Sequence, residues 1–173
     1  MNEQWIEEQR AVAEAVVAED DVEWDISADG QPATSGGSDR PRRPLRLLGG
    51  VDISFVKGSD ENACASLVVL EYPSLRVVFE AHDRVVMDRP YVAGFLAFRE
   101  VGHLVRLVRR LRAERPDLEP DVLFVDGNGL LHPRGAGLAC HLGVATGMRV
   151  LGVGKTFLHV DGLTKDWVRD RAR

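Results

Sequence analysis

The chain has 173 residues, of which 45% are hydrophobic and 28% are charged, which suits one packed domain and argues against global disorder. It has no run of 18 consecutive apolar residues, and an acidic stretch follows Met1, so we expect neither a membrane span nor a secretory signal peptide. Cys64 and Cys140 are far apart and lack metal-ligand spacing, which predicts reduced core thiols in a reducing compartment and no zinc site.

The charge is divided unevenly along the chain. Residues 1–30 hold ten acidic side chains against Arg10 alone, a net charge of −9. Because the whole chain carries −5, residues 31–173 carry +4. A mildly basic body behind an acidic head permits a polyanionic partner without requiring one.

The N-terminal part is expected to be a helix followed by a tether. Apolar side chains fall near one stripe of residues 4–18, with glutamates opposite, which predicts an amphipathic helix. Residues 27–44 are rich in turn formers and nearly free of large apolar residues, so burial cannot offset their ordering entropy. We therefore divide the chain into an acidic helical segment at 1–26, a flexible linker at 27–44 and a folded domain at 45–173.

The remaining sequence alternates strand and helix patterns. It predicts, in chain order, strands at 47–56, 63–72 and 76–86, a helix at 93–113, a strand at 122–125, a helix at 137–146 and a strand at 149–153. The last two strands are short apolar runs, typical of strands buried on both faces. Strands first, then helix–strand alternation, indicate an α/β fold: a mixed β-sheet flanked by helices.

Asp52 is a carboxylate in the middle of the first strand. With a period of two, Val51 and Ile53 share one face of that strand and Asp52 shares the other with Ser54. Taken alone, Asp52 is best read as a solvent-facing strand residue.

Glu100 lies on the apolar stripe of the predicted helix at 93–113. Four leucines lie within about 40° of it on the helical wheel: Leu96, Leu104, Leu107 and Leu111. An unpaired charge at such a position costs several kcal/mol or more, so Glu100 needs a cation. A metal ion and a buried arginine satisfy this requirement equally well.

Asp126 ends the strand at 122–125 and opens the segment Asp-Gly-Asn-Gly. Ligand sites gather at the carboxyl ends of parallel strands, although these residue types also form ordinary turns. Asp52, Glu100 and Asp126 come from a strand, a helix and a strand end, and together they could supply oxygen ligands for Mg²⁺ or Mn²⁺.

Several segments, in this order, resemble the endonuclease V family: GGVDISF at 49–55, PYVAGFLAFRE at 90–100, VDGNG with the following HPR at 125–134, GLACHLG at 137–143 and GVGK at 152–155. The resemblance runs from about Leu47 to Gly162 and is closer to the animal branch. It implies a ribonuclease H-like fold, so that residues 45–173 form an endonuclease V catalytic domain.

The resemblance also implies an activity and its residues. Family members hydrolyse the second phosphodiester 3′ to inosine and leave 3′-hydroxyl and 5′-phosphate ends; the expected substrate is inosine-containing RNA, with deoxyinosine-containing DNA as the alternative. Asp52, Glu100 and Asp126 are the implied ligands of Mg²⁺, for which Mn²⁺ can substitute, and Lys155 is the implied phosphate contact. We expect a monomer in the cytoplasm or the nucleus and nucleolus, with no membrane partner.

Base recognition is implied for two further groups of residues. The segment Pro90, Tyr91 and Val92 resembles the family's wedge, whose aromatic ring can replace the stacking that a flipped base loses. The implied hypoxanthine pocket, with its supporting contact His132, consists of Gly94, Leu96, Gly127, Gly137 and Leu138. The plainer interpretation of Tyr91 is a loop aromatic that packs on the core, and that of the glycines is turn geometry.

Two departures from the family pattern stand out. Gly154 replaces a usual alanine, but Arg149 occupies a position that a P-loop would require to be glycine, so a nucleoside triphosphatase is excluded. After Gly162 the sequence leaves the pattern, and we expect the C-terminal part of the domain to be missing. The alternative function is therefore a catalytically impaired truncated isoform that binds inosine-containing nucleic acid without cleaving it.

Overall fold

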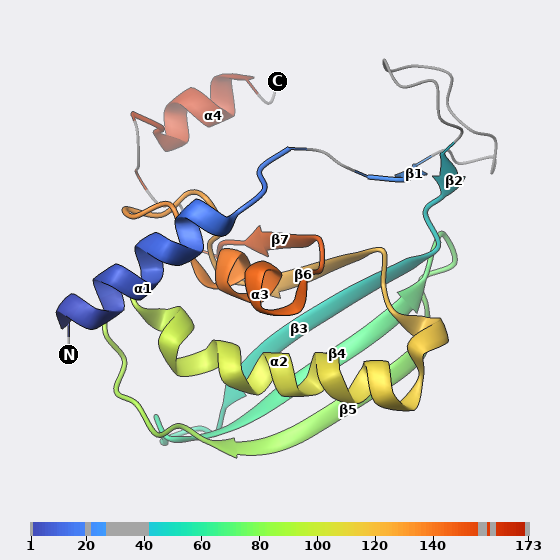
Figure 1. Cartoon of the computed structure of the whole chain (residues 1–173), viewed down its shortest axis with the longest axis horizontal. Coiled ribbons are helices and arrows are strands. Elements are labelled where there is room, and N and C mark those ends of the chain that lie inside the picture. The colour runs from blue at the N-terminus through green and yellow to red at the C-terminus, as the bar shows by residue number, and fades with distance from the viewer. Residues whose placement is uncertain (1, 20–21, 27–41, 156–158, 160–161, 172–173) are drawn as a thin grey trace.

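A computed structural model of the chain describes residues 2–19, 22–26, 42–155, 159 and 162–171. The described residues form a five-stranded mixed sheet with helices beside it (Figure 1). The elements are α1 (Asn2–Ala15), β1 (Trp24–Asp25), β2 (Arg43–Pro44), β3 (Leu47–Phe55), β4 (Asn62–Glu71), β5 (Arg76–Val86), α2 (Leu96–Glu114), the 3₁₀ turn η1 (Pro116–Leu118), β6 (Val122–Asp126), α3 (Leu138–Thr146), β7 (Val150–Val153) and α4 (Lys165–Arg171).

The sheet has the strand order β5-β4-β3-β6-β7. β3, β4 and β5 form an antiparallel meander, whereas β3, β6 and β7 run parallel to one another. In the middle of the sheet Val51 pairs with Leu67 on one side and with Val125 on the other. The carboxyl ends of β3, β6 and β7 therefore lie at one edge of the sheet (Figure 1). This arrangement confirms the predicted mixed α/β sheet.

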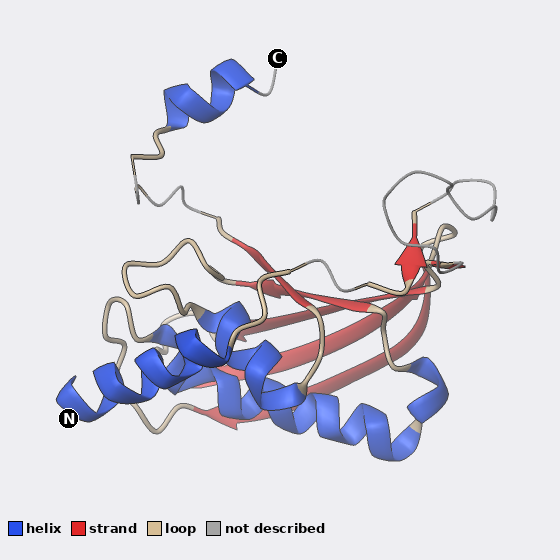
Figure 2. Cartoon of the chain, turned by 45° about the horizontal axis from the view of Figure 1, so that its top comes forward, coloured by secondary structure: helices blue, strands red, loops and turns tan. Residues whose placement is uncertain are grey.

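Helices α2 and α3 pack on one face of the sheet, which we call the helical face (Figure 2). Leu67 and Leu123 from the strands and Leu107 from α2 are fully buried there. Every second residue of β4 from Ala63 to Val69 points to this layer and is buried, as the two-residue period of a strand requires. The core thus lies between the sheet and these two helices.

The opposite face, which we call the open face, corrects part of the sequence prediction. Phe124 of β6 is 36% exposed, and Leu151 and Val153 of β7 are 52% and 50% exposed. The prediction that β6 and β7 are buried on both faces is wrong in the part of the chain that the structure describes. β7 is an edge strand, and α2 and α3 cover only the helical face.

Helix α1 packs on α3, and its end at Ala15 comes three residues before the predicted one. Most of the predicted linker lies outside the described residues, but its last two, Arg43 and Pro44, pair in parallel with Trp24 and Asp25. This small β-structure ties the residues after α1 to the start of the sheet. None of the helices described is long and apolar enough to cross a membrane.

Candidate functional site

The structure places Asp52 and Asp126 on neighbouring strands at the same edge of the sheet. Val51 pairs with Val125, so the next residue of each strand is one of these two aspartates. Both follow a valine that is buried on the helical face, and the two-residue period turns both toward the open face. Asp52 also accepts a hydrogen bond from the Ser54 hydroxyl at 2.9 Å.

Glu100 joins this pair from the first turns of α2. Its side chain is buried, with 7% of the residue exposed, which confirms its predicted place on the core-facing stripe. Burial raises the pKa of Glu100 to about 7; the positive charge of Arg99 opposes this shift, and the negative charges of Asp126 and Asp52 add to it. The three carboxylates are therefore close enough to act on one another's charge.

Lys155 brings a positive charge to the same place. Its ammonium group forms an ion pair with Asp126, and this contact raises the pKa of Lys155; the more distant Asp52 and Glu100 act in the same direction. Lys155 lies two residues after the end of β7, so the parallel order β3-β6-β7 brings it to the same end of the sheet as the aspartates. Residues separated by a hundred positions in sequence thus form one charged cluster.

The donor chemistry of this cluster suits a hard divalent cation, because carboxylate oxygens are the ligands that Mg²⁺ and Mn²⁺ prefer. The buried carboxyl of Glu100, whose pKa two nearby acids help to raise, is also a group whose charged form a cation would stabilise. Among the described residues, however, no group of three or more His, Cys, Asp or Glu side chains is gathered tightly enough to hold a metal ion. The cation beside Asp126 in this structure is Lys155, and the metal site stays a prediction.

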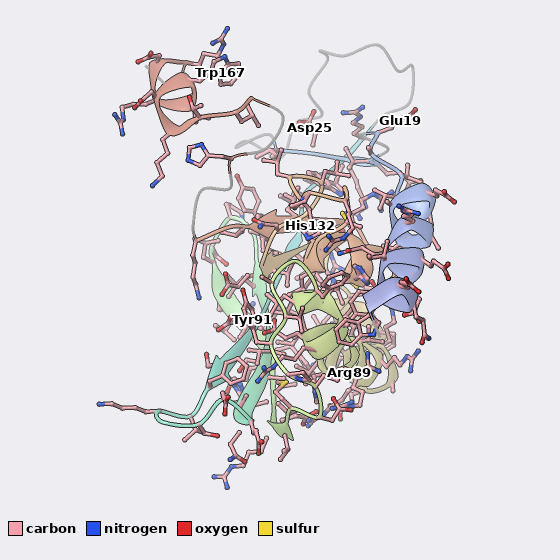
Figure 3. The ribbon with its side chains drawn as sticks, turned by 90° about the vertical axis from the view of Figure 1, so that its left-hand side faces the viewer. Glu19, Asp25, Arg89, Tyr91, His132 and Trp167 are labelled. Atoms are coloured by element: carbon pink, nitrogen blue, oxygen red, sulfur yellow. The ribbon has the colours of Figure 1, made fainter. Side chains whose placement is uncertain are left out.

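The predicted wedge lies in the loop before α2. Pro90 and Tyr91 are exposed, Tyr91 to 66%, so the tyrosine does not pack into the core. The loop closes at a hydrogen bond that the Phe95 amide donates to the Val92 carbonyl at 2.9 Å. Figure 3 shows Tyr91 and His132 on the side of the molecule that faces the viewer.

His132 is half-buried in the loop between β6 and α3. Burial lowers its pKa, and the nearby Arg134 charge lowers it further. The amide of Arg134 donates a hydrogen bond to His132 Nδ1 at 3.2 Å, which fixes the direction of the ring. The imidazole is thus held in a defined orientation beside the loop that precedes α2.

The predicted pocket residues gather where backbone segments pack against one another. Gly94 and Leu96 lie at the start of α2, Gly137 and Leu138 at the start of α3, and Gly127 follows β6. A Cβ at Gly137 would lie 2.2 Å from the Asn128 carbonyl oxygen, so no larger residue fits there. The backbones of the two loops therefore pack directly on each other at this point, and the roles of these five residues in base recognition stay predictions.

Two residues of this region were not assigned a role from sequence. Gln9 of α1 is only 1% exposed and donates hydrogen bonds to the carbonyl oxygens of Gly94 and Ala136, while Arg134 donates to the Gln9 side chain. A signal was available, because Gln9 follows Trp5 by four residues and thus lies on the buried stripe of the helix. A polar side chain on an apolar stripe needs partners, as it does at Glu100.

The structure also has a groove of about 410 Å³ at the other end of the sheet. Its charged lining includes Arg46, Arg76 and Arg115, but Arg76 is paired with Glu71 and Arg115 with Asp117. Because acids already neutralise two of the three cations, this groove has little excess charge with which to hold an anion.

The sequence and the structure are both similar to known proteins. The sequence model of the family described as Endonuclease V matches residues 34–171. Endonuclease V of Mus musculus is 52% identical over 159 residues, which are 92% of this chain and 44% of that protein. Endonuclease V of Homo sapiens is 51% identical over 159 residues, 92% of this chain and 52% of that protein. The chain thus spans about half the length of these two relatives.

Solved structures agree. The catalytic domain of human endonuclease V superimposes with a TM-score of 0.79 and 46% identity, covering 99% of this chain and 65% of that one. Ciona intestinalis endonuclease V, in complex with a 23mer DNA containing an inosine followed by a ribo-adenosine, gives a TM-score of 0.79 at 31% identity over 98% of this chain and 64% of that one. The likeness confirms the ribonuclease H-like fold class. On these grounds the chain belongs to the endonuclease V family.

Proposed function

We propose that this chain is a divalent-metal-dependent endonuclease that hydrolyses the second phosphodiester 3′ to inosine in RNA and leaves 3′-hydroxyl and 5′-phosphate ends. The observation that carries the proposal is the meeting of Asp52, Glu100, Asp126 and Lys155 at one edge of the sheet, in a chain of this family. Nucleic acid is the favoured substrate class because the Ciona relative is bound to inosine-containing DNA.

Each side chain has a task in this proposal. Asp52, Glu100 and Asp126 would hold Mg²⁺ or Mn²⁺, which supplies activation of water and stabilisation of charge on the leaving oxygen. Lys155, whose pKa is raised by Asp126, stays protonated and contacts a phosphate oxygen near the cut once it leaves the carboxylate. The acidic cluster alone would repel a polyanion, so a cationic contact beside it is required.

Base recognition lies on the loops beside the cluster. Tyr91 is exposed on its loop and can stack in the space that a flipped base leaves, a contact worth about 1–3 kcal/mol. The backbone groups near Gly94, Gly127 and Gly137 would then read the base through hydrogen bonds, and His132 would support the nucleotide.

The proposal is tested by incubating the chain and Mg²⁺ with an RNA that contains a single inosine. We expect one cut, at the second phosphodiester 3′ to inosine, none in the matched adenosine RNA and none after chelation of the metal. Glu100→Gln should lower the cleavage rate by about a hundredfold or more, because it removes a charge from the metal ligands. Glu7→Gln, on an exposed position of α1, is the matched control and should cleave as the wild type does.

Deoxyinosine DNA and DNA with one ribonucleotide after the inosine complete the substrate set. Faster cleavage of RNA supports the proposed preference, and equal rates contradict it. Failure to cut any inosine substrate, while a full-length relative cuts them under the same conditions, contradicts the proposed activity.

A second candidate function is binding of inosine-containing RNA without cleavage. Two observations favour it: the described residues include no ready-made metal cage, and Lys155 is bound to one of the proposed ligands. Tighter binding of inosine RNA than of adenosine RNA, without product in Mg²⁺ or Mn²⁺, would support this function over the nuclease.

A further inference from the structure

The side chain of Gln9 connects three segments that are far apart in sequence. It lies on α1 and is 1% exposed. Its Nε2 donates hydrogen bonds to the carbonyl oxygens of Ala136 at 2.7 Å and Gly94 at 3.2 Å, and its Oε1 accepts one from Arg134 Nε. Both ends of this buried amide are therefore satisfied, and each partner is on a loop rather than on a regular element.

Arg134 completes the connection. Its Nη2 donates to the Gly94 carbonyl at 2.5 Å, and its guanidinium lies 4.1 Å from the centre of the Phe95 ring. Gly94 has φ +78°, and a Cβ there would lie 2.7 Å from Arg134 Nη2. Glycine is thus favoured by the backbone conformation, and a side chain there would also displace the end of Arg134.

Helix α1 is firmly held where it presents Gln9. Trp5, one turn before Gln9, stacks on Phe98 with ring centres 5.1 Å apart and planes 5° apart, and it also contacts Phe95 at 5.7 Å. Because residues four apart share a helix face, the aromatic contact and the amide contacts act from the same side of α1. Movement of Gln9 would require this aromatic packing to open.

The two loops that Gln9 joins are those to which the proposed function gives base recognition. One, at 90–95, carries Tyr91; the other, at 127–137, carries Gly127, His132 and Gly137. We propose that Gln9 and Arg134 form a clamp that sets the distance between these loops and thereby the selectivity for inosine over adenosine. Gln9 is a positioning residue in this proposal, and the proposal rests on the proposed function.

The chemistry of discrimination explains why spacing matters. Inosine and adenosine differ in whether a carbonyl oxygen or an amino group occupies one position of the purine ring. A site that reads this difference with backbone donors and acceptors depends on hydrogen-bond distances near 2.9 Å, and loses its preference when the groups move apart. A flexible pocket would accept both bases.

The first test is the Gln9→Met variant, which keeps the volume of the side chain and removes the three hydrogen bonds of the Gln9 side chain, while the bond from Arg134 to the Gly94 carbonyl remains. Gln4→Met is the matched control, since Gln4 is an exposed glutamine on the same helix. For Gln9→Met we expect the ratio of the binding affinities for inosine RNA and adenosine RNA to fall about tenfold, with Gln4→Met unchanged. An unchanged ratio in a folded Gln9→Met variant overturns the proposal.

Gln9→Glu distinguishes the bond that Gln9 accepts from Arg134 from the two bonds that it donates, and it replaces Gln9→Met in the test if that variant does not fold. The carboxylate keeps the contact with Arg134 but cannot donate to Gly94 and Ala136. We expect a smaller loss of selectivity than in Gln9→Met. A wild-type ratio in this variant would show that the two donated bonds do not set the pocket, and would overturn their part in the proposal.

The second test needs no substrate. Amide hydrogen exchange of Phe95, Gly135 and Gly137, whose N–H groups bond within the two loops, should be about tenfold faster in Gln9→Met than in Gln4→Met. Unchanged exchange overturns the clamp itself. Faster exchange in a chain that neither prefers nor cleaves inosine RNA means that the clamp exists but the proposed function, and with it the role in selectivity, has failed.

Discussion

The two faces of the same sheet differ in burial and in the side chains that they present. On the helical face, Leu67 and Val69 are fully buried against the helical layer and Val125 is 1% exposed. On the open face, the same sheet presents Asp52 and Asp126 together with exposed apolar residues such as Phe124 and Leu151. Apolar packing is concentrated on the first face and the two aspartates lie on the second, whereas Glu100 reaches them from α2 of the helical layer, where burial disfavours its charged form and raises its pKa to about 7.

The largest expected difference between the faces is in the free energy of unfolding after a leucine is truncated. Leu67→Ala should lower it by about 2–5 kcal/mol, since it opens a cavity between β4 and the helices. Leu151→Ala, on the open face and 52% exposed, should change it by less than about 0.5 kcal/mol. Urea denaturation of both variants measures the difference, and equal effects would contradict the contrast between the faces.

A buried histidine in the helical layer should make the free energy of unfolding depend on pH in mild acid. His141 of α3 packs edge-on against Phe98, and burial lowers its pKa to about 4. In the unfolded chain the imidazole of His141 becomes protonated near pH 6.5, whereas in the folded chain it becomes protonated only near pH 4. The free energy of unfolding therefore falls as the pH drops from 6.5 toward 4. The contribution of His141 to that fall is about 3 kcal/mol.

The acid effect is measured as the difference between the wild type and His141→Gln across this pH range. His82→Gln, an exposed position on the open face, is the control variant. The free energy of unfolding of His141→Gln should depend less on pH than that of the wild type. If the free energies of unfolding of the wild type and His141→Gln changed with pH in parallel, His141 would not be the source of the pH dependence.

The smallest expected effect compares two neighbouring glycines of β3 on opposite faces. A Cβ at Gly49 would lie 2.6 Å from Leu123 and 2.8 Å from Pro120, whereas a Cβ at Gly50 would have nothing within 4 Å. Gly49→Ala should destabilise the protein by about 1–3 kcal/mol. Gly50→Ala should be neutral or stabilise it by up to about 1 kcal/mol, because alanine has less freedom in the unfolded chain. Thermal unfolding measures the change in stability of each variant and tests whether only Gly49→Ala is destabilised.

Sequence reasoning succeeded where local periodicity carries the information. The strand at 76–86 has its predicted boundaries, and helical periodicity correctly predicts that Glu100 lies on the buried stripe of α2. Helix α4 was missed because its seven residues bury nothing and so leave no apolar pattern, although the Thr164 hydroxyl accepts a hydrogen bond from the Trp167 amide, as a helix cap does.

The candidate site was predictable in part. The choice of Asp52, Glu100 and Asp126 came from their residue types and their positions in elements, and from a family resemblance. Their approach to one another, and the ion pair of Asp126 with Lys155, depend on which strands are neighbours. Likewise, the isolation of β7 at the sheet edge contradicts the expectation drawn from its apolar run. Strand order is a long-range property that no local pattern encodes.

The sequence alone determined α1, α2, α3, the five strands of the main sheet and the chemical identity of the charged cluster, because side-chain periodicity and residue chemistry are local. Tertiary structure decided which face of each strand is covered, that Lys155 reaches Asp126, and that Gln9 of the first helix bonds to loops more than 80 residues away. These contacts join segments that are far apart in sequence and meet only when the whole domain is packed, so no local sequence pattern predicts them.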